Sequence, residues 1–338
     1  IMKHNIDGVY LSSDVIRYYP YGSYLSHVIG IVGVDNQGLT GLEYIYNDYF
    51  LGNVGSSNIF TDAHGNKIGE IGDSYTEPTK GLDLYLTIDI NMQVSLERIL
   101  DNSSVQYKMA EGIGLIMNPK TSEIYAMSSR PTFDPNNYQD YNQEIYNRNL
   151  TIWKSFEPGS TFKYVTFSAG IEEGVFNVNE IFNDIGYSVV DGVRIKDWKK
   201  GGHGVETFYE VIQNSCNPGF VEIGKRLGKE KLFEYIKKYG FGSKTGVDLL
   251  GESTGILFNT ENIGNVETAT ASFGQGNSTT PIQIVNGVSA CINGGTLHQP
   301  YILKGIGLNS NIVLSANDLK PCNSSLFKYM YFIHLYCY

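Results

Sequence analysis

Apolar and polar residues alternate from Leu82 to Thr87, the pattern of a β-strand with one buried face. Asp89 follows directly and is a residue type that caps helices. The apolar positions of the helix expected after it are Met92, Leu96, Ile99 and Leu100. Two apolar runs, 113–117 and 124–127, then flank a Pro-containing turn and predict a hairpin. Such strands and helices predict a fold of the α+β or α/β class, in which helices flank an antiparallel sheet.

The first 80 residues have a different composition. They are rich in Gly, Tyr and Asn and contain short apolar runs that favour extended structure, such as 28–34. A stretch of turn-forming residues at 77–81 predicts a hinge. We therefore expect a first domain at 1–80 and a second domain that begins at residue 81.

The overall composition narrows the classes of function. A chain of 338 residues with 41% hydrophobic residues can form about two domains with real cores. The net charge of −10, with no basic cluster, argues against binding to nucleic acid. No apolar run is long enough to span a bilayer, and no signal peptide is visible. The 4 cysteines are too dispersed for a disulfide framework.

Ser160 and Lys163 give the strongest chemical signal. They stand three residues apart at the start of a helix expected from Ser160 to about Glu173, so their side chains share one face. There the lysine amine can take the proton of the serine hydroxyl, provided that burial keeps the amine neutral. The start of a helix also favours the negative charge that develops in acyl transfer. Taken alone, however, the pattern is better explained by a serine that only caps the helix.

Ser215 and Asn217 supply a second signal. They lie on a short loop between the amphipathic stretch 207–213 and Pro218, a residue that can open a helix. Two residues apart, their side chains point to the same side, where one could relay a proton and the other bond a substrate carbonyl. Taken alone, they are better explained as part of a polar loop between two helices. Together with Ser160 and Lys163, they favour a composite active site.

These residues resemble the class B penicillin-binding proteins, the DD-transpeptidases that cross-link peptidoglycan, in which S-x-x-K and S-x-N motifs form the active site. The resemblance extends over roughly residues 5 to 307, which implies a second domain at 81–307 and a divergent tail at 308–338. Residues 213–220 are most similar to the sporulation-associated branch. Further motifs in the same order are 17–20, 38–43, 86–89, 117–120, 131–136, 202–204, 274–276 and 293–295. The resemblance implies the penicillin-binding transpeptidase fold, similar to β-lactamases, preceded by part of a mixed pedestal or dimerisation domain.

The resemblance also assigns roles. Ser160 would be the acylated nucleophile and Lys163 its general base. Ser215 would pass the proton to the leaving D-alanine, and Asn217 would hold the D-Ala-D-Ala donor of a peptidoglycan stem peptide. β-Lactams would imitate that donor and block Ser160. No cofactor is implied.

The third motif of the class, Lys-Thr-Gly on an edge strand, is expected after Gly295 and does not occur there. Lys244-Thr245-Gly246 comes too early and follows the glycine-rich segment 239–243, which predicts a loop, so we reject it. The missing strand would bind the substrate carboxylate and complete the oxyanion hole, and one lost oxyanion donor typically costs about 10²–10³ in rate. We therefore expect impaired chemistry in this chain.

The resemblance places the intact protein outside the cytoplasm, held by an N-terminal membrane anchor. Neither this anchor nor the last motif is present, so we interpret the chain as a fragment. The aromatic segment 326–338 is unlike a domain end and too short to span a bilayer. In the intact protein we expect a membrane glycan polymerase as partner and a dimer formed through the first domain.

Asp197, His203, Cys216 and Cys291 offer oxygen, nitrogen and sulfur atoms that a structural zinc ion could accept. Cys216 lies between Ser215 and Asn217, so its side chain should point away from the cleft and toward the core. The alternative is that the cysteines are small buried apolar residues and that His203 bonds a backbone carbonyl. These spacings match no standard zinc motif.

Two other functions share part of this pattern. A β-lactamase or β-lactam sensor would use S-x-x-K and S-x-N, but neither explains the preceding 80 residues. A catalytically silent scaffold would bind cell-wall or sporulation partners through 1–80 without being acylated. Turnover of a chromogenic β-lactam would indicate a lactamase, and partner binding without acylation would indicate a scaffold.

Overall fold

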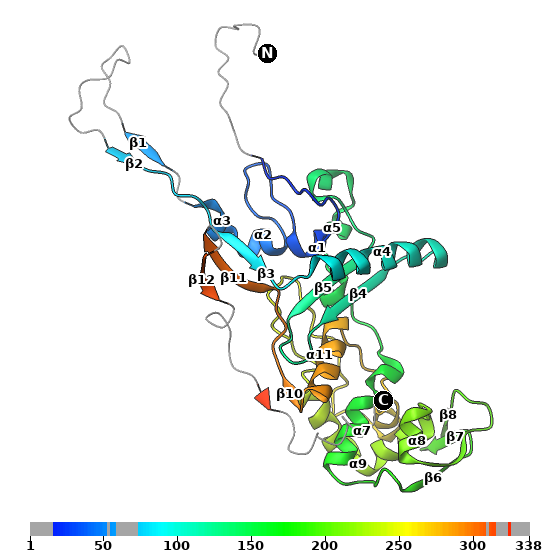
Figure 1. Ribbon diagram of the computed structural model, residues 1–338. Helices are drawn as coiled ribbons and strands as arrows, with labels where there is room; N and C mark the ends of the chain where they lie inside the picture. Colours follow the sequence, from blue (N-terminus) through cyan, green and yellow to red (C-terminus); the bar gives the residue numbers. More distant parts are fainter. Residues whose placement is uncertain (1–15, 53–54, 59–73, 309–310, 316–323, 326–338) are drawn as a thin grey trace, which may run out of the picture.

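The computed structural model describes residues 16–52, 55–58, 74–308, 311–315 and 324–325. The predicted tail segment 326–338 lies outside these residues. The described chain forms an upper part, which contains the N-terminal elements and the longest strands, and a lower part made mainly of helices (Figure 1). Helix α11 (Pro281–Ile292) runs between the two parts (Figure 1).

The N-terminal part consists of short elements. They are α1 (Ser26–Ile29), α2 (Gly41–Ile45), α3 (Asn47–Leu51), β1 (Ser56–Asn58) and β2 (Ser74–Thr76), and the two strands pair antiparallel. The prediction of extended structure over 28–34 was wrong at its start, because Val28 and Ile29 lie in α1. Val28 is buried in a core shared with the second domain.

The expected strand and hairpin are confirmed. Strand β3 (Asp83–Leu86) pairs antiparallel with β11 (Leu303–Leu308), which pairs with β12 (Asn311–Ser315). Strands β4 (Gly112–Met117) and β5 (Ile124–Arg130) form the antiparallel hairpin, with Leu115 opposite Met127. The Ile124 amide donates to the Tyr301 carbonyl, which links the hairpin to the chain entering β11.

Helix α4 (Ile90–Tyr107) begins as predicted, since the Asp89 carboxylate accepts from the amides of Asn91 and Met92. The buried side of α4 is not the side that the apolar positions of the sequence predicted. Gln93 and Glu97 are buried, whereas Met92 and Ile99 are 40% and 58% exposed. The two polar side chains bond each other, and Gln93 also bonds the Met127 backbone of β5, so their burial leaves them hydrogen-bonded.

The remaining elements belong mostly to the lower part. They are η1 (Pro135–Asp140), α5 (Gln143–Tyr146), α6 (Leu150–Trp153), η2 (Gly159–Phe162), α7 (Lys163–Glu172), β6 (Ile181–Asp184), β7 (Tyr187–Val190), β8 (Val193–Lys196), β9 (Gly204–Thr207), α8 (Phe208–Gln213), α9 (Asn217–Lys238), α10 (Asn265–Ala271), β10 (Thr296–Leu297) and β13 (Ser324–Ser325). Strands β6 and β9 form one antiparallel pair, and β7 and β8 form another. The main core of this part surrounds α7 and includes Phe162, Val165, Phe220 and Ile223.

Candidate active site

Ser160 is the second residue of the short 3-10 helix η2. Helix α7 follows η2 directly and begins at Lys163. The expected helix is therefore present, but its first turn is tighter than an α-helix. Phe162 is fully buried and fixes this turn in the core, while Ser160 is exposed. Within the described part of the chain, the Ser160 hydroxyl makes no hydrogen bond, so it is open to an incoming substrate.

The turn that carries Ser160 contacts the glycine-rich segment 274–276. The Gly159 amide donates to the Gly274 carbonyl at 2.9 Å. Gly274 has a φ of 85°, and a Cβ atom on it would lie 2.1 Å from the Gly159 carbonyl oxygen and 2.7 Å from Cβ of Phe162. Only glycine permits both this backbone conformation and this close approach.

Lys163 is the centre of the polar contacts. Its side chain is buried, and Nζ donates to the Ser215 carbonyl at 2.7 Å, to Ser215 Oγ at 2.9 Å and to Asn217 Oδ1 at 2.7 Å. Burial lowers the pKa of Lys163 to about 8, against an opposing effect of Asp197. The structure thus brings three of the four predicted residues into direct contact, with Ser160 three residues before Lys163 on the same element.

The loop that carries Ser215 and Asn217 is held from several sides. Ser215 has a left-handed backbone with a φ of 54°, which is uncommon for a residue with a side chain. Asn217 is the first residue of α9, and Pro218 follows it, as the sequence predicts. The Asn217 amide donates to Asp197 Oδ1 at 2.9 Å.

Lys244-Thr245-Gly246 lies in a loop, as expected. The amide and hydroxyl of Thr245 donate to Glu252 Oε1 at 2.6 and 2.5 Å, and the Gly246 amide donates to Oε2 at 3.1 Å. The buried Glu252 carboxylate therefore accounts for this segment without any role in the active site.

Four ligand-type residues gather beside the Ser215 loop. Asp184, Asp197, His203 and Cys216 each offer one ligand atom, and these atoms lie within 4.8 Å of one another. The Cys216 side chain points into the core, as predicted, and caps α9 by accepting from the Gly219 amide at 3.4 Å. His203 Nδ1 lies 3.1 Å from Asp184 Oδ2 and 3.0 Å from Asp197 Oδ2.

The predicted metal set needs one correction. Cys291 is not in this cluster: it lies on α11, where its Sγ is 3.1 Å from the Tyr239 hydroxyl. Asp184, at the end of β6, takes its place. Pairing of β6 with β9 sets Asp184 opposite Gly204, next to His203, and this tertiary pairing left no signal in the local spacing.

The charges in the cluster suit a cation. The Asp184, Asp197 and His203 side chains are at most 6% exposed. Burial would raise the pKa of Asp184, but the amides of Gly186 and His203 hold it below its usual value. His203 Nδ1 carries at most one hydrogen, so it can donate to only one of the two carboxylates. Among the described residues, Asp197 Oδ2 accepts no hydrogen bond. Two buried carboxylates with an unsatisfied oxygen beside a thiol match a structural zinc site in chemistry.

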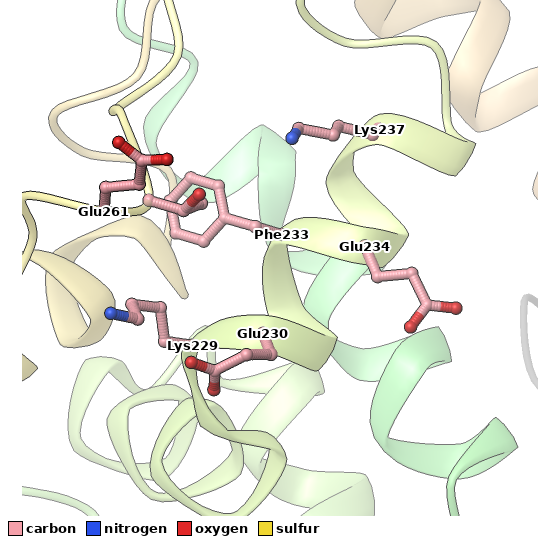
Figure 2. A pocket seen from close by; sticks show the side chains of 7 residues that line it. Lys229, Glu230, Phe233, Glu234, Lys237 and Glu261 are labelled. Atoms are coloured by element: carbon pink, nitrogen blue, oxygen red, sulfur yellow. The ribbon is translucent and has the colours of Figure 1, made fainter.

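A separate groove follows the second half of α9 (Figure 2). It has a volume of about 550 Å³ and is lined by Lys229, Glu230, Phe233, Lys237 and Glu261, among others. None of the residues around Lys163 lines it. We also find that, over the described residues, no helix has the length and apolar character needed to cross a membrane.

Comparison with protein families gives two matches. Residues 112–322 match the penicillin binding protein transpeptidase domain, and residues 1–86 match the penicillin-binding protein dimerisation domain. The chain is 56% identical to stage V sporulation protein D of Bacillus subtilis over 89% of the chain and 47% of that protein. It is 31% identical to the peptidoglycan D,D-transpeptidase FtsI of Escherichia coli over 89% of the chain and 50% of that protein.

Solved structures agree with this fold. A peptidoglycan synthetase from Bifidobacterium adolescentis superimposes with a TM-score of 0.81 at 25% identity, over 92% of this chain and 56% of that one. The apo form of penicillin binding protein 3 from Mycobacterium tuberculosis gives a TM-score of 0.79 at 27% identity, over 91% and 65%. The chain spans about half the length of the curated relatives it matches. By these matches and by its fold, the chain belongs to the class B penicillin-binding protein transpeptidases.

Proposed function

We propose that this protein is acylated at Ser160 by the D-Ala-D-Ala end of a peptidoglycan stem peptide and acts as a D,D-transpeptidase, with acylation slowed because no Lys-Thr-Gly motif follows Gly295. The observation that carries this proposal is the buried Lys163 amine, one helical turn from Ser160 and within 2.9 Å of Ser215 and Asn217. A base with a pKa near 8 has a neutral fraction at neutral pH, which a lysine in water lacks.

In the first step, Ser160 Oγ attacks the carbonyl carbon between the two D-alanines, and its proton passes to Lys163. The peptide C–N bond breaks, and a proton delivered through Ser215 leaves with the free D-alanine. In the second step, the amine of a neighbouring stem peptide attacks the Ser160 ester, and a cross-link forms as Ser160 regains its proton. Asn217 serves to hold the donor peptide.

The setting of this reaction is part of the proposal. Cross-linking of stem peptides requires a location outside the cytoplasm, where we expect an N-terminal anchor and a membrane glycan polymerase to accompany the intact protein. The match to a dimerisation domain supports self-association through the N-terminal part.

We further propose that Asp184, Asp197, His203 and Cys216 hold a structural zinc ion. When bound, the ion would neutralise the two carboxylates and fix the loop on both sides of Cys216. Asp197 already accepts from the Asn217 amide, so this cluster supports the position of Asn217 without contact with substrate. The chemistry at Ser160 requires no cofactor.

Intact-mass measurement after incubation with fluorescent penicillin tests the acylation. We expect one adduct per chain, absent from Ser160→Ala, and slow release, because a transpeptidase ester persists in the absence of an acceptor amine. Rapid turnover of the β-lactam would instead indicate a lactamase. A folded protein without an adduct would contradict the proposed function.

A further inference from the structure

Ser215 adopts a backbone conformation that needs support. A φ of 54° is unfavourable for a residue with a Cβ atom. Part of its support is local, because the Ser215 amide donates to the Ile212 carbonyl at 3.1 Å and the Cys216 amide to the Val211 carbonyl at 3.0 Å, the hydrogen bonds of a Schellman motif at the end of α8. That motif usually has glycine where Ser215 stands, so the serine needs further support. In this conformation both the carbonyl oxygen and Oγ of Ser215 accept from Lys163 Nζ, at 2.7 and 2.9 Å. The left-handed turn therefore determines two of the three contacts of Lys163.

The residue before Ser215 is held by two contacts from other segments. The Asn214 carbonyl accepts from the indole N–H of Trp198 at 2.9 Å. The Asn214 side-chain amide donates to Glu206 Oε2 at 2.8 Å. Trp198 follows β8, Glu206 lies on β9 and Asn214 directly follows α8, so three segments converge on one residue.

Neither partner is placed where folding alone would put it. Glu206 is a carboxylate only 4% exposed. Trp198 is a large aromatic side chain that remains 67% exposed, with its ring at an angle against His203. Burial of the Glu206 carboxylate opposes stability, which points to a role in positioning.

We propose that Trp198, Asn214 and Glu206 are positioning residues that hold Ser215 in its left-handed conformation and thereby keep Lys163 aligned for acylation. This inference rests on the proposed function for its catalytic consequence, but the conformation of Ser215 can be measured independently. We call these three residues the Asn214 brace.

Each contact of the brace can be removed separately. Trp198→Phe removes the N–H donor and keeps an aromatic ring beside His203. Asn214→Ala and Glu206→Ala break the second contact, whereas Glu206→Gln retains an acceptor for the Asn214 amide. Thr207→Ala is the matched control: it removes the capping box at the other end of α8 and leaves the brace intact.

Two measurements follow: the backbone torsion of Ser215 from NMR chemical shifts, and the dependence of the acylation rate on fluorescent penicillin concentration. We expect Asn214→Ala and Glu206→Ala to lose the left-handed conformation and to lower the limiting rate about ten-fold, with the half-saturating concentration unchanged. Trp198→Phe should lower that rate about five-fold, because its contact is more accessible to water. Glu206→Gln should remain within about two-fold of the parent protein.

The outcomes separate the two proposals. If Thr207→Ala lowers only the unfolding temperature while the brace variants change Ser215, the inference stands. If Ser215 stays left-handed in both Trp198→Phe and Asn214→Ala, the brace is wrong, whatever the activity. If the parent protein is never acylated, the proposed function fails, and the torsion of Ser215 still decides on the brace.

Discussion

Lys163 has three acceptors within 2.9 Å, which suits a charged ammonium, yet burial lowers its pKa to about 8. The two effects oppose each other, because acceptors favour the charged amine and desolvation favours the neutral one. As a result, the amine changes its charge near physiological pH. Because part of the Lys163 population is then uncharged, Lys163 can act as a general base.

The pH dependence of acylation follows from this value. Only the neutral Lys163 amine can accept the Ser160 proton, so the acylation rate by penicillin should rise about ten-fold per pH unit below the pKa and level off above it. The rate should be measured from pH 6 to 9, with circular dichroism at each pH to show that the fold is unchanged. A rate that does not change over this range would exclude Lys163 as the base.

At the scale of elements, the Ser215 loop depends on segments distant in sequence. The end of β6, the chain after β8, the residue before β9 and the cap of α9 each contribute one residue to the cluster of Asp184, Asp197, His203 and Cys216. The cysteines provide an internal comparison, because Cys216 and Cys291 are both buried and only Cys216 belongs to the cluster.

Substitution of Cys216 and of Cys291, one at a time, tests the proposed zinc site. We expect elemental analysis to find about one zinc per chain in the parent protein and in Cys291→Ser, and little in Cys216→Ser or His203→Ala. A strong chelator should lower the unfolding temperature of the parent protein, because zinc binds the folded state. Substoichiometric zinc that is unchanged in His203→Ala would contradict the site.

At the scale of the whole molecule, the N-terminal part is hydrogen-bonded to a buried carboxylate of the second domain, which also forms an ion pair there. Glu97 on α4 accepts from the Leu25 amide at 3.1 Å, and its other carboxylate oxygen lies 2.8 Å from the Arg130 guanidinium on β5. Both side chains are at most 8% exposed. Arg130 also contacts Asp101 at 2.6 Å.

Removal of Glu97 should be costly for this reason. Glu97→Ala leaves the Arg130 charge buried with only the partly exposed Asp101, and we expect a loss of about 3 kcal/mol in the free energy of unfolding. Glu144→Ala is the control, because its pair with Arg148 is exposed, and it should cost less than about 0.5 kcal/mol. Chemical denaturation measures both, and equal losses would refute the buried contact.

The sequence by itself determined the elements whose signals are local. Alternation predicted β3, the residue type of Asp89 predicted the start of α4, and the turn at 118–121 predicted the β4–β5 hairpin. The spacing of Ser160 and Lys163, and of Ser215 and Asn217, also identified the residues that we propose for the active site. These features depend on neighbours along the chain, which the sequence states directly.

Only the tertiary structure decided the features that depend on distant partners. Met92 and Ile99 are exposed while Gln93 and Glu97 are buried, because β5 supplies hydrogen-bond partners to the polar side of α4. The pairing of β6 with β9 brought Asp184, rather than Cys291, to His203 and Cys216. The contacts of Asn214 with Trp198 and Glu206 likewise join segments that no local pattern connects.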